Sequence, residues 1–202
     1  MVGLGGGEPL ADTGRAEATP PRRAYHRGMP ELQRLRLDHA PALLRFEQEN
    51  RAYFAASIPD RGDHYFAHFD ARHRELMAEQ AAGLHFFHVL VGSSGEVLGR
   101  VNLVDAEGGS AELGYRIAEQ AAGRGLATAA VREVCALAVA EYGLTTLRAV
   151  TTLDNPGSRA VLARTGFVTT GEIELDGRQG LQFVRDLQDA RVEAEPAPGV
   201  IG

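Results

Sequence analysis

The chain has 202 residues, of which 44% are hydrophobic and 24% are charged, a composition typical of a soluble protein with one well-formed core. The formal net charge of −6 argues against nucleic-acid binding through clustered positive charge and suits cationic partners such as amines. No run approaches the ~20 apolar residues that span a bilayer, and the N-terminus lacks the pattern of a signal peptide, so we expect no membrane association and a cytoplasmic location.

Both ends of the chain differ in composition from its middle. Residues 1–28 and 188–202 are rich in Gly, Pro, Ala and charged residues, with few large apolar side chains. Such segments bury too little surface to order themselves, so we predict a disordered N-terminal tail, a flexible C-terminal tail and one domain over 29–187. The single cysteine, Cys135, excludes an internal disulfide, and its apolar neighbours indicate a buried, unreactive thiol.

Hydrophobic periodicity predicts the elements of the first half of the domain. An alternating run comes first, and two helical patterns follow, one with Asp38 as its N-cap and one that ends at Gly83. Three strand-like runs come next, separated by glycine-containing turns. The predicted elements are a strand at 31–37, helices at 38–54 and 63–83, and strands at 85–91, 96–104 and 111–117.

The second half of the domain alternates helices and strands and ends in a hairpin. A long helix with apolar residues at helical spacing ends at Gly143, and Asp176-Gly177 is a strong signal for a two-residue hairpin turn. The other predicted elements are a strand at 145–152, a helix at 155–166 and strands at 167–175 and 178–187. This order indicates a mixed α/β (α+β) domain whose sheet is partly antiparallel, and parallel where helices intervene.

A glycine-rich turn precedes the long helix, in the sequence EQAAGRGLATAAVREV at 119–134. The first N–H groups of a helix have no partner within it and the helix dipole adds positive potential, so the turn favours an anion. Glycine at 123 and 125 leaves room for a phosphate near the backbone. A P-loop is excluded because the chain has no lysine, and a dinucleotide-binding turn is disfavoured because Thr128 occupies its third glycine position. The alternative is a tight turn before a helix.

The same turn carries a motif. It reads Gln120-x-x-Gly123-x-Gly125, after the strand-like AELGYRI and before the long helix, and it resembles the acetyl-CoA motif of the GCN5-related N-acetyltransferases, the GNAT superfamily. The sequence TTLDNPGSRAVLARTGF at 151–167 extends the match and is most similar to the RimJ/RimL group, which acetylates protein N-termini. The resemblance implies a GNAT-like mixed sheet of about six to seven strands, flanked by helices, whose central fourth and fifth strands splay apart.

The resemblance also implies acetyl-CoA as co-substrate and assigns residues to it. The backbone at the end of the fourth strand would pair with the pantetheine arm, at Arg116, Ile117 and Ala118. The pyrophosphate would lie on the turn and the first helical residues, namely Gln120, Gly123, Arg124, Gly125, Leu126, Ala127 and Thr128. Asn155 would contact the pantetheine arm or serve only as a helix N-cap. Arg159 would reach the adenosine phosphate or remain a solvated helix arginine.

Acetyl transfer to an amine needs a base, because only the neutral amine attacks the thioester. Strand alternation places Glu112 on one face of AELGYRI with Gly114 and Arg116, and a carboxylate within a sheet is costly unless it has a partner or a role. A glutamate in this place also matches the base of several GNAT enzymes, often acting through water. The alternative is a carboxylate paired with Arg100 or Arg148.

The leaving thiolate benefits from a proton donor. Many GNAT enzymes use a tyrosine in the helix after the fifth strand, but the matching position here is Leu162. The RimJ/RimL group carries a serine instead, matched by Ser158, whose hydroxyl would hydrogen-bond the sulfur. The alternative is that Ser158 only takes part in capping the helix, with Asn155 and Pro156. The expected catalytic residues are therefore Glu112 and Ser158.

Other side chains near the amine side have two interpretations each. His64 and His68 lie one helical turn apart, a spacing that can hold a metal, but no HExxH motif or cysteine accompanies them, and we expect no metal site. Nearby aromatic residues are expected mainly to pack in the core, with the wall of an acceptor site as the alternative: Tyr53, Phe54, Tyr65, Phe66 and Phe69. Arg116 stands where many members of the group have a tryptophan, on the amine side of the site, so the resemblance defines the reaction more closely than the acceptor.

Together these features predict an acetyl-CoA-dependent N-acetyltransferase that works by direct attack in a ternary complex. The expected acceptor is a protein or peptide N-terminal α-amine of the ribosomal-protein type. The alternatives are a small-molecule amine, such as an antibiotic, or a catalytically silent acyl-CoA-binding module. The expected partners are acetyl-CoA and the amine acceptor, with no nucleic acid and no membrane, and a homodimer is left open.

Overall fold

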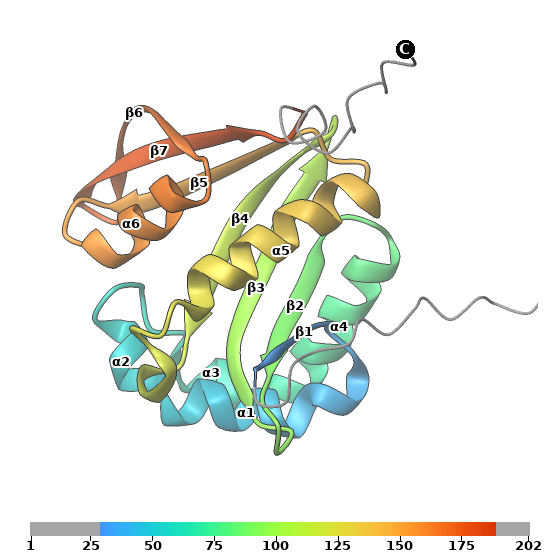
Figure 1. Cartoon of the computed structure of the whole chain (residues 1–202). Helices are drawn as coiled ribbons and strands as arrows, with labels where there is room; N and C mark the ends of the chain where they lie inside the picture. Colours follow the sequence, from blue (N-terminus) through green and yellow to red (C-terminus); the bar gives the residue numbers. More distant parts are fainter. Residues whose placement is uncertain (1–28, 189–202) are drawn as a thin grey trace, which may run out of the picture.

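A computed structural model describes residues 29–188, so both predicted tails, apart from Gln188, lie outside the described residues. Its centre is one seven-stranded sheet in the order β1-β2-β3-β4-β5-β7-β6 (Figure 1). Neighbouring strands are antiparallel except β4 and β5, which are parallel because α5 crosses over between them. The strands are β1 (Glu31–Arg34), β2 (Phe86–Val91), β3 (Val97–Glu107), β4 (Ser110–Ile117), β5 (Thr146–Thr152), β6 (Val168–Leu175) and β7 (Arg178–Asp186).

Helices form where the hydrophobic periodicity predicts them, but two predicted helices are divided. The segment 38–54 is interrupted at Asn50, and the segment 63–83 is interrupted at His68. None of the helices within 29–188 is long and apolar enough to cross a membrane. The helices are η1 (Leu37–His39), α1 (Ala40–Glu49), α2 (Arg51–Ala55), α3 (Gly62–Ala67), α4 (Phe69–Ala81), η2 (Glu119–Ala121), α5 (Leu126–Ala140) and α6 (Pro156–Arg164).

The prediction that Asp38 caps a helix is wrong. Asp38 lies inside the 3-10 turn η1, and its carboxylate accepts a hydrogen bond from the guanidinium of Arg36 at 3.0 Å. α1 begins at Ala40, with Pro41 in its first turn, where the missing N–H of proline leaves no helical bond unmade. The carboxylate of Asp38 therefore bonds to the side chain of Arg36 and does not cap a helix N-terminus.

Two hydrophobic layers cover the two faces of the sheet. On one face α5 packs through Val131 and Val134, and Cys135 lies buried there, as its neighbours predict. On the other face α1, α2 and α4 pack through a second set of buried side chains, which includes Leu43 and Phe46. The predicted Asp176-Gly177 turn is confirmed, since it joins β6 to β7 as an antiparallel hairpin.

β4 and β5 separate along their length, as the family resemblance implies. Their pairing covers only three positions, Ser110–Thr146, Ala111–Leu147 and Glu112–Arg148. Beyond these pairs β4 bonds to β3 alone, whereas β5 continues beside β7. The two strands therefore enclose a V-shaped opening in the middle of the sheet, with its vertex at Glu112 (Figure 1).

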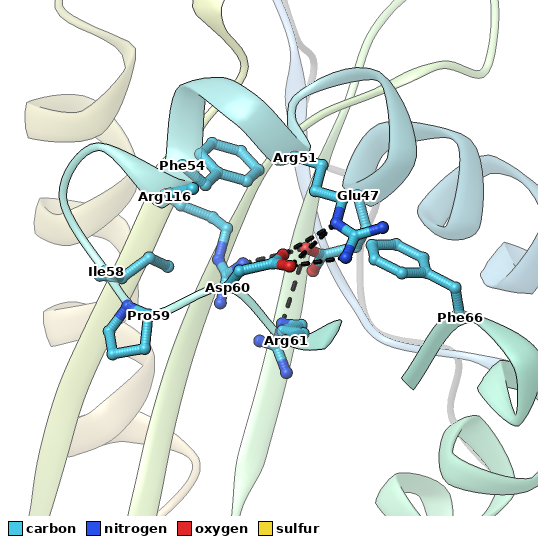
Figure 2. A pocket seen from close by; sticks show the side chains of 10 residues that line it. Glu47, Arg51, Phe54, Ile58, Pro59, Asp60, Arg61, Phe66 and Arg116 are labelled. Atoms are coloured by element: carbon cyan, nitrogen blue, oxygen red, sulfur yellow. Dashed lines mark hydrogen bonds and ion pairs between the residues drawn. The ribbon is translucent and has the colours of Figure 1, made fainter. Parts of the chain in front are cut away.

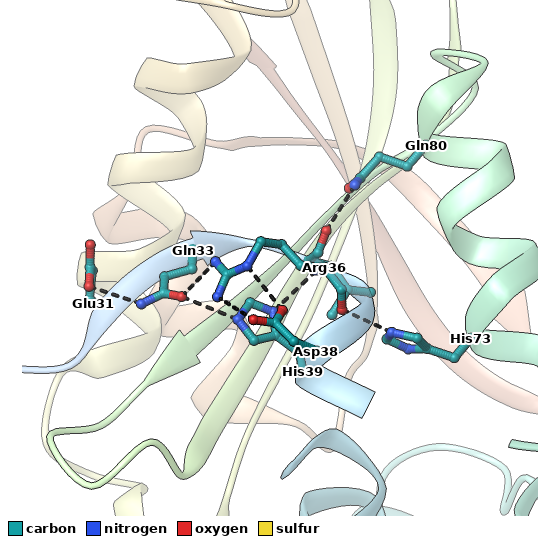
Figure 3. Close-up of polar contacts among 8 residues, drawn as sticks. Glu31, Gln33, Arg36, Asp38, His39, His73 and Gln80 are labelled. Atoms are coloured by element: carbon teal, nitrogen blue, oxygen red, sulfur yellow. Dashed lines mark hydrogen bonds and ion pairs between the residues drawn. The ribbon is translucent and has the colours of Figure 1, made fainter. Parts of the chain in front are cut away.

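Side chains that bind backbone carbonyls fasten α4 to the segment after β1 (Figure 3). Gln80 donates to the carbonyl of Leu35 at 3.0 Å, and Nε2 of His73 donates to the carbonyl of Arg36 at 3.0 Å. The N–H of Arg36 in turn donates to Nδ1 of His39 at 3.2 Å. These bonds satisfy carbonyls that leave the sheet after β1 and hold the helical layer against it.

Candidate active site

The turn after β4 exposes a row of backbone N–H groups. Gly123 and Gly125 have φ values of +74° and +75°, a left-handed conformation that favours glycine at both positions. A Cβ on either residue would meet nothing within 4 Å, so the space beside them is open. Within the described part of the chain, the N–H groups from Gly123 to Thr128 have no hydrogen-bond acceptor. Such a row at the start of a long helix suits an anion.

Asn50 ties this turn to the helical layer. Its buried side chain accepts a hydrogen bond from the N–H of Glu119 at 2.9 Å and donates to the carbonyl of Phe46 at 2.9 Å. Both ends of the amide are therefore used, which fixes where the chain leaves β4 and enters the turn. Asn50 was not among the sequence candidates, although it shares an apolar helical stripe with Phe46.

Backbone groups at the end of β4 alternate between β3 and the opening. The N–H of Ala118 donates to the carbonyl of Leu98 on the β3 side at 2.9 Å. Because an antiparallel ladder repeats every two residues, the backbone of Arg116 also faces β3, whereas Tyr115 and Ile117 direct theirs to the opening. Among the residues predicted to pair with the pantetheine arm, Ile117 is thus the one whose backbone faces the V.

Two hydroxyl groups meet across the opening. The oxygens of Tyr115, on β4, and Ser158, on α6, lie 3.0 Å apart, and burial raises the pKa of Tyr115 even though Ser158 opposes the shift. Asn155 caps α6 by accepting a hydrogen bond from the N–H of Ser158 at 3.0 Å. The capping interpretation therefore describes Asn155, and the hydroxyl of Ser158 has a separate contact. Leu162 is buried in the core, and as a leucine it supplies no hydroxyl at the position where many family members have a tyrosine.

Glu112, Gly114 and Arg116 share one face of β4, as the alternation predicts. Glu112 stands beside Arg148 at the last paired position of β4 and β5. Among the described residues it forms no ion pair, with Arg148 or with Arg100, so the predicted alternative partners do not engage it. Gly114 is exposed, and a Cβ there would meet nothing within 4 Å. This face of β4 is therefore an open surface at Gly114, and the half-buried carboxylate of Glu112 lies at its end, at the vertex of the opening between β4 and β5. We call this surface the open floor of β4.

A small pocket, open to solvent, lies beside Arg116, farther along the same strand (Figure 2). Its walls come from α1, α2, α3, β4 and the loop between α2 and α3. Two of the predicted aromatic candidates, Phe54 and Phe66, line it, and Phe54 also packs in the core, as Phe69 does. The lining residues are Glu47, Arg51, Phe54, Ala55, Ile58, Pro59, Asp60, Arg61, Phe66 and Arg116.

Glu47 lies at the centre of a buried ion-pair cluster that the sequence analysis missed. Its carboxylate is 2.8 Å from Arg100, 2.9 Å from Arg116 and 3.8 Å from Arg61. Burial favours a raised pKa for Glu47, but attraction to the three guanidinium groups outweighs it and lowers the pKa. Burial lowers the pKa of Arg116 to about 10, against the attraction of Glu47. The sequence signal is that Glu47 follows Leu43 by one turn on the apolar face of its helix.

The loop between α2 and α3 also contacts the far side of the opening. Arg178, at the start of β7, donates to the carbonyl of Ser57 and pairs with Asp154, which follows β5. On the near side, Arg51 of α2 holds Asp60 of the loop at 2.6 Å (Figure 2). The loop is therefore attached to α2 on one side and to the start of β7 on the other.

The remaining sequence candidates lie outside these contacts. Arg159 donates to the carbonyl of Leu153 at 3.2 Å and is exposed, and Arg124 is exposed within the turn. The rings of His64 and His68 stack with centroids 4.2 Å apart. Across 29–188 no group of three or more His, Cys, Asp and Glu side chains is placed to hold a metal ion.

Residues 31–168 match the family model described as an acetyltransferase (GNAT) domain. The chain belongs to the GNAT family. It is an acetyl-CoA-dependent N-acetyltransferase, with acetyl-CoA as its co-substrate. The geometry fits that co-substrate, because a row of N–H donors suits a diphosphate and an unpaired strand edge suits the amides of pantetheine. No curated protein sequence matches the chain.

Solved structures of bacterial acetyltransferases share the fold. The ribosomal-protein-S5-alanine acetyltransferase of Vibrio fischeri matches with a TM-score of 0.76 and 19% identity, over 83% of this chain and 98% of that one. Mycobacterium smegmatis RimJ, in complex with CoA-disulfide, matches with a TM-score of 0.68 and 24% identity, over 81% and 88%. A variant of the spermidine N-acetyltransferase SpeG of Vibrio cholerae matches with a TM-score of 0.64 and 15% identity, over 82% and 99%.

Proposed function

We propose that the chain acetylates the N-terminal α-amine of a protein or peptide by direct attack on acetyl-CoA in a ternary complex. The observation that carries the proposal is the open floor of β4 at Gly114, which leads from Glu112 to the pocket beside Arg116. An extended chain end fits such a floor. A polyamine fits less well, because three arginines and two carboxylates line the pocket and like charges repel.

Acetyl-CoA is proposed to bind along the opening and the turn. The N–H groups from Gly123 to Thr128 would hold the diphosphate, with Arg124 adding a charge. The backbone of Ile117 and Tyr115 faces the opening and would pair with the pantetheine amides. Asn155 accepts a hydrogen bond from the N–H of Ser158, and Arg159 donates one to the carbonyl of Leu153. Their proposed contacts with the co-substrate therefore rest on the family resemblance.

Glu112 is proposed as the general base. It lies at the vertex of the opening with no ion-pair partner among the described residues, so its carboxylate is available to accept a proton. An N-terminal α-amine has a pKa near 8, so on the order of a tenth is already neutral at pH 7. A carboxylate that acts directly or through a water is adequate for such an acceptor.

Ser158 is proposed to donate a hydrogen bond to the leaving sulfur. Its hydroxyl meets that of Tyr115 at 3.0 Å, and both face the space that a pantetheine arm would occupy between β4 and α6. Tyr115 remains protonated at neutral pH, because burial raises its pKa, and it orients the serine. The pair would supply the hydroxyl that other family members obtain from a tyrosine at the position of Leu162.

The test is an assay of thiol release from acetyl-CoA with unrelated N-terminal peptides, spermidine and aminoglycosides as acceptors. We expect peptide acetylation, and a decrease of at least about tenfold in kcat/KM for Glu112→Gln with unchanged affinity for CoA. Turnover of spermidine or aminoglycosides without peptide turnover would assign a small-molecule acceptor. Tight CoA binding without any turnover would indicate a silent binding module.

A further inference from the structure

We propose that the pocket beside Arg116 binds a carboxylate of the acceptor. The enzyme would therefore prefer acceptors whose first or second residue carries an acidic side chain. This inference rests on the proposed function, and it names the class of substrate that the same site selects. It follows from the charges in the pocket wall, from the apolar groups beside these charges and from the position of Arg116 on β4 near Gly114.

The buried cluster has more positive than negative charge. Glu47 is the carboxylate that Arg100, Arg116 and Arg61 share; the side chain of Arg100 is buried, that of Arg116 is 18% exposed and that of Arg61 is 33% exposed. In addition, Nε of Arg100 is buried without an acceptor in the described part of the chain. Three guanidinium groups around one carboxylate leave an uncompensated positive charge at the pocket, which solvent screens only in part and which favours an anion.

The other carboxylates at the pocket do not cancel this surplus. Asp60 is bound by Arg51 at 2.6 Å, and the same arginine reaches Asp63 at 2.7 Å. Asp63 is 93% exposed and does not line the pocket, so solvent screens its charge. Among the lining residues the arginines therefore exceed the carboxylates.

The pocket walls place apolar groups beside the charged ones. Arg116 lies over the ring of Phe54, with the guanidinium carbon 5.1 Å from the ring centroid, which restricts the plane of the guanidinium. Ile58 and Pro59 give the wall an apolar part beside the charges (Figure 2). The space enclosed between the walls is about 10 Å³, room for about one water or one carboxylate oxygen, so only the charged end of an acidic side chain would enter it.

The pocket is also near the proposed site of transfer. Arg116 and Gly114 point to the same face of β4, two residues apart, which is roughly 7 Å along a strand. An amine above Gly114 would therefore place a carboxylate of its own or the following residue within reach of Arg116. This local preference is opposite to the one that the overall charge of −6 indicates.

The test compares acceptors that differ only in charge. Four peptides with N-terminal alanine carry Ala, Asp, Glu or Lys at the second position, and free glutamate and free alanine form a second arm. We expect kcat/KM for the acidic peptides to exceed that for the Ala peptide by about tenfold or more, and the Lys peptide to be the poorest. Added salt should reduce the advantage of the acidic peptides.

Arginine variants locate the effect. Arg61→Gln, at an exposed position, and Arg116→Gln should each bring the acidic-to-neutral ratio toward one. Arg45→Gln, the same change at an exposed position on α1, should leave it unchanged. Thermal melts and CoA titration identify a variant that fails to fold or to bind co-substrate, and Arg61→Gln then decides the question alone.

The outcomes separate this inference from the function on which it rests. Equal acetylation of acidic and neutral peptides, or a ratio that survives Arg61→Gln, overturns the carboxylate site and leaves the peptide acetyltransferase intact. A preference for free glutamate over every peptide supports the carboxylate site and overturns the peptide acceptor. Failure of every amine overturns both.

Discussion

The hydroxyl groups of Tyr115 and Ser158 lie 3.0 Å apart and connect β4 to α6 across the opening between β4 and β5. The contact joins residues 43 positions apart in the chain, one on each side of the V. It brings a protonated tyrosine hydroxyl to the serine that family resemblance proposes as the partner of the leaving sulfur.

Removal of these hydroxyls should affect chemistry more than binding. We expect Ser158→Ala to lower kcat by about 10- to 100-fold, because the departing thiolate loses its donor. Tyr115→Phe should lower kcat by a smaller factor, because the serine stays but is no longer oriented. The KM for acetyl-CoA should change little in both variants. A loss in Tyr115→Phe with normal rates in Ser158→Ala would contradict this order of roles.

Alanine at Gly125 should weaken co-substrate binding. Its φ of +75° costs an L-residue about 1–2 kcal/mol, and relief of that strain would rotate the N–H groups at the start of α5. Gly143→Ala is the matched control, because Gly143 has a φ of +65° and equally open surroundings but lies beyond the other end of the helix. We expect calorimetry to show weaker CoA binding only for Gly125→Ala, and denaturant melts to show a similar loss of stability for both. Equal CoA affinities would exclude the turn as the binding site.

Loss of the carboxylate in the buried cluster should destabilise the fold. Glu47→Gln leaves the guanidinium groups of Arg100 and Arg116 without a counter-charge, and breaking a buried pair from one side costs about 3–5 kcal/mol. Glu49→Gln, an exposed change on the same helix, should remain within about 0.5 kcal/mol of the parent chain. Urea unfolding at pH 7 measures both values. A loss below about 1 kcal/mol for Glu47→Gln would show that the cluster is not essential to stability.

Stability should fall as the pH drops below about 6.5, in part through His88. Burial lowers the pKa of this residue to about 4, while its ring donates to the carbonyl of Val101 and accepts from the hydroxyl of Tyr142. The unfolded chain, with a histidine pKa near 6.5, then binds more protons than the folded chain, and the difference amounts to about 2 kcal/mol between pH 7 and pH 5.

His88→Phe isolates that contribution. The variant should be less stable at pH 7, because it loses two hydrogen bonds, but its stability should decrease less between pH 7 and pH 5. A smaller dependence should remain, since burial also lowers the pKa of His39. An unchanged difference between the two pH values would mean that His88 does not titrate in this range.

Local sequence patterns predicted the parts of the molecule that short-range forces determine. The glycines at 123 and 125 indicated a turn before the long helix, and the structure has that turn, with both glycines at positive φ. Alternation in β4 correctly assigned Glu112 and Tyr115 to opposite faces of the strand. Asp38 failed as a cap because Arg36, two residues away, competes for the same carboxylate.

Contacts between distant segments were beyond the reach of such patterns. Arg100 was considered as a partner of Glu112, but Glu47 takes it from a helix 53 positions earlier. Periodicity places Glu47 on an apolar face without indicating which buried arginine it meets. The Tyr115–Ser158 contact is similar, since it depends on how far β4 and β5 diverge, and this is a property of the assembled sheet.

The most direct test of the account is a structure of the chain crystallised with coenzyme A. The account predicts the diphosphate on the N–H groups from Gly123 to Thr128, and the sulfur within hydrogen-bond distance of Ser158. A diphosphate bound elsewhere, or a sulfur directed away from the opening between β4 and β5, would contradict it.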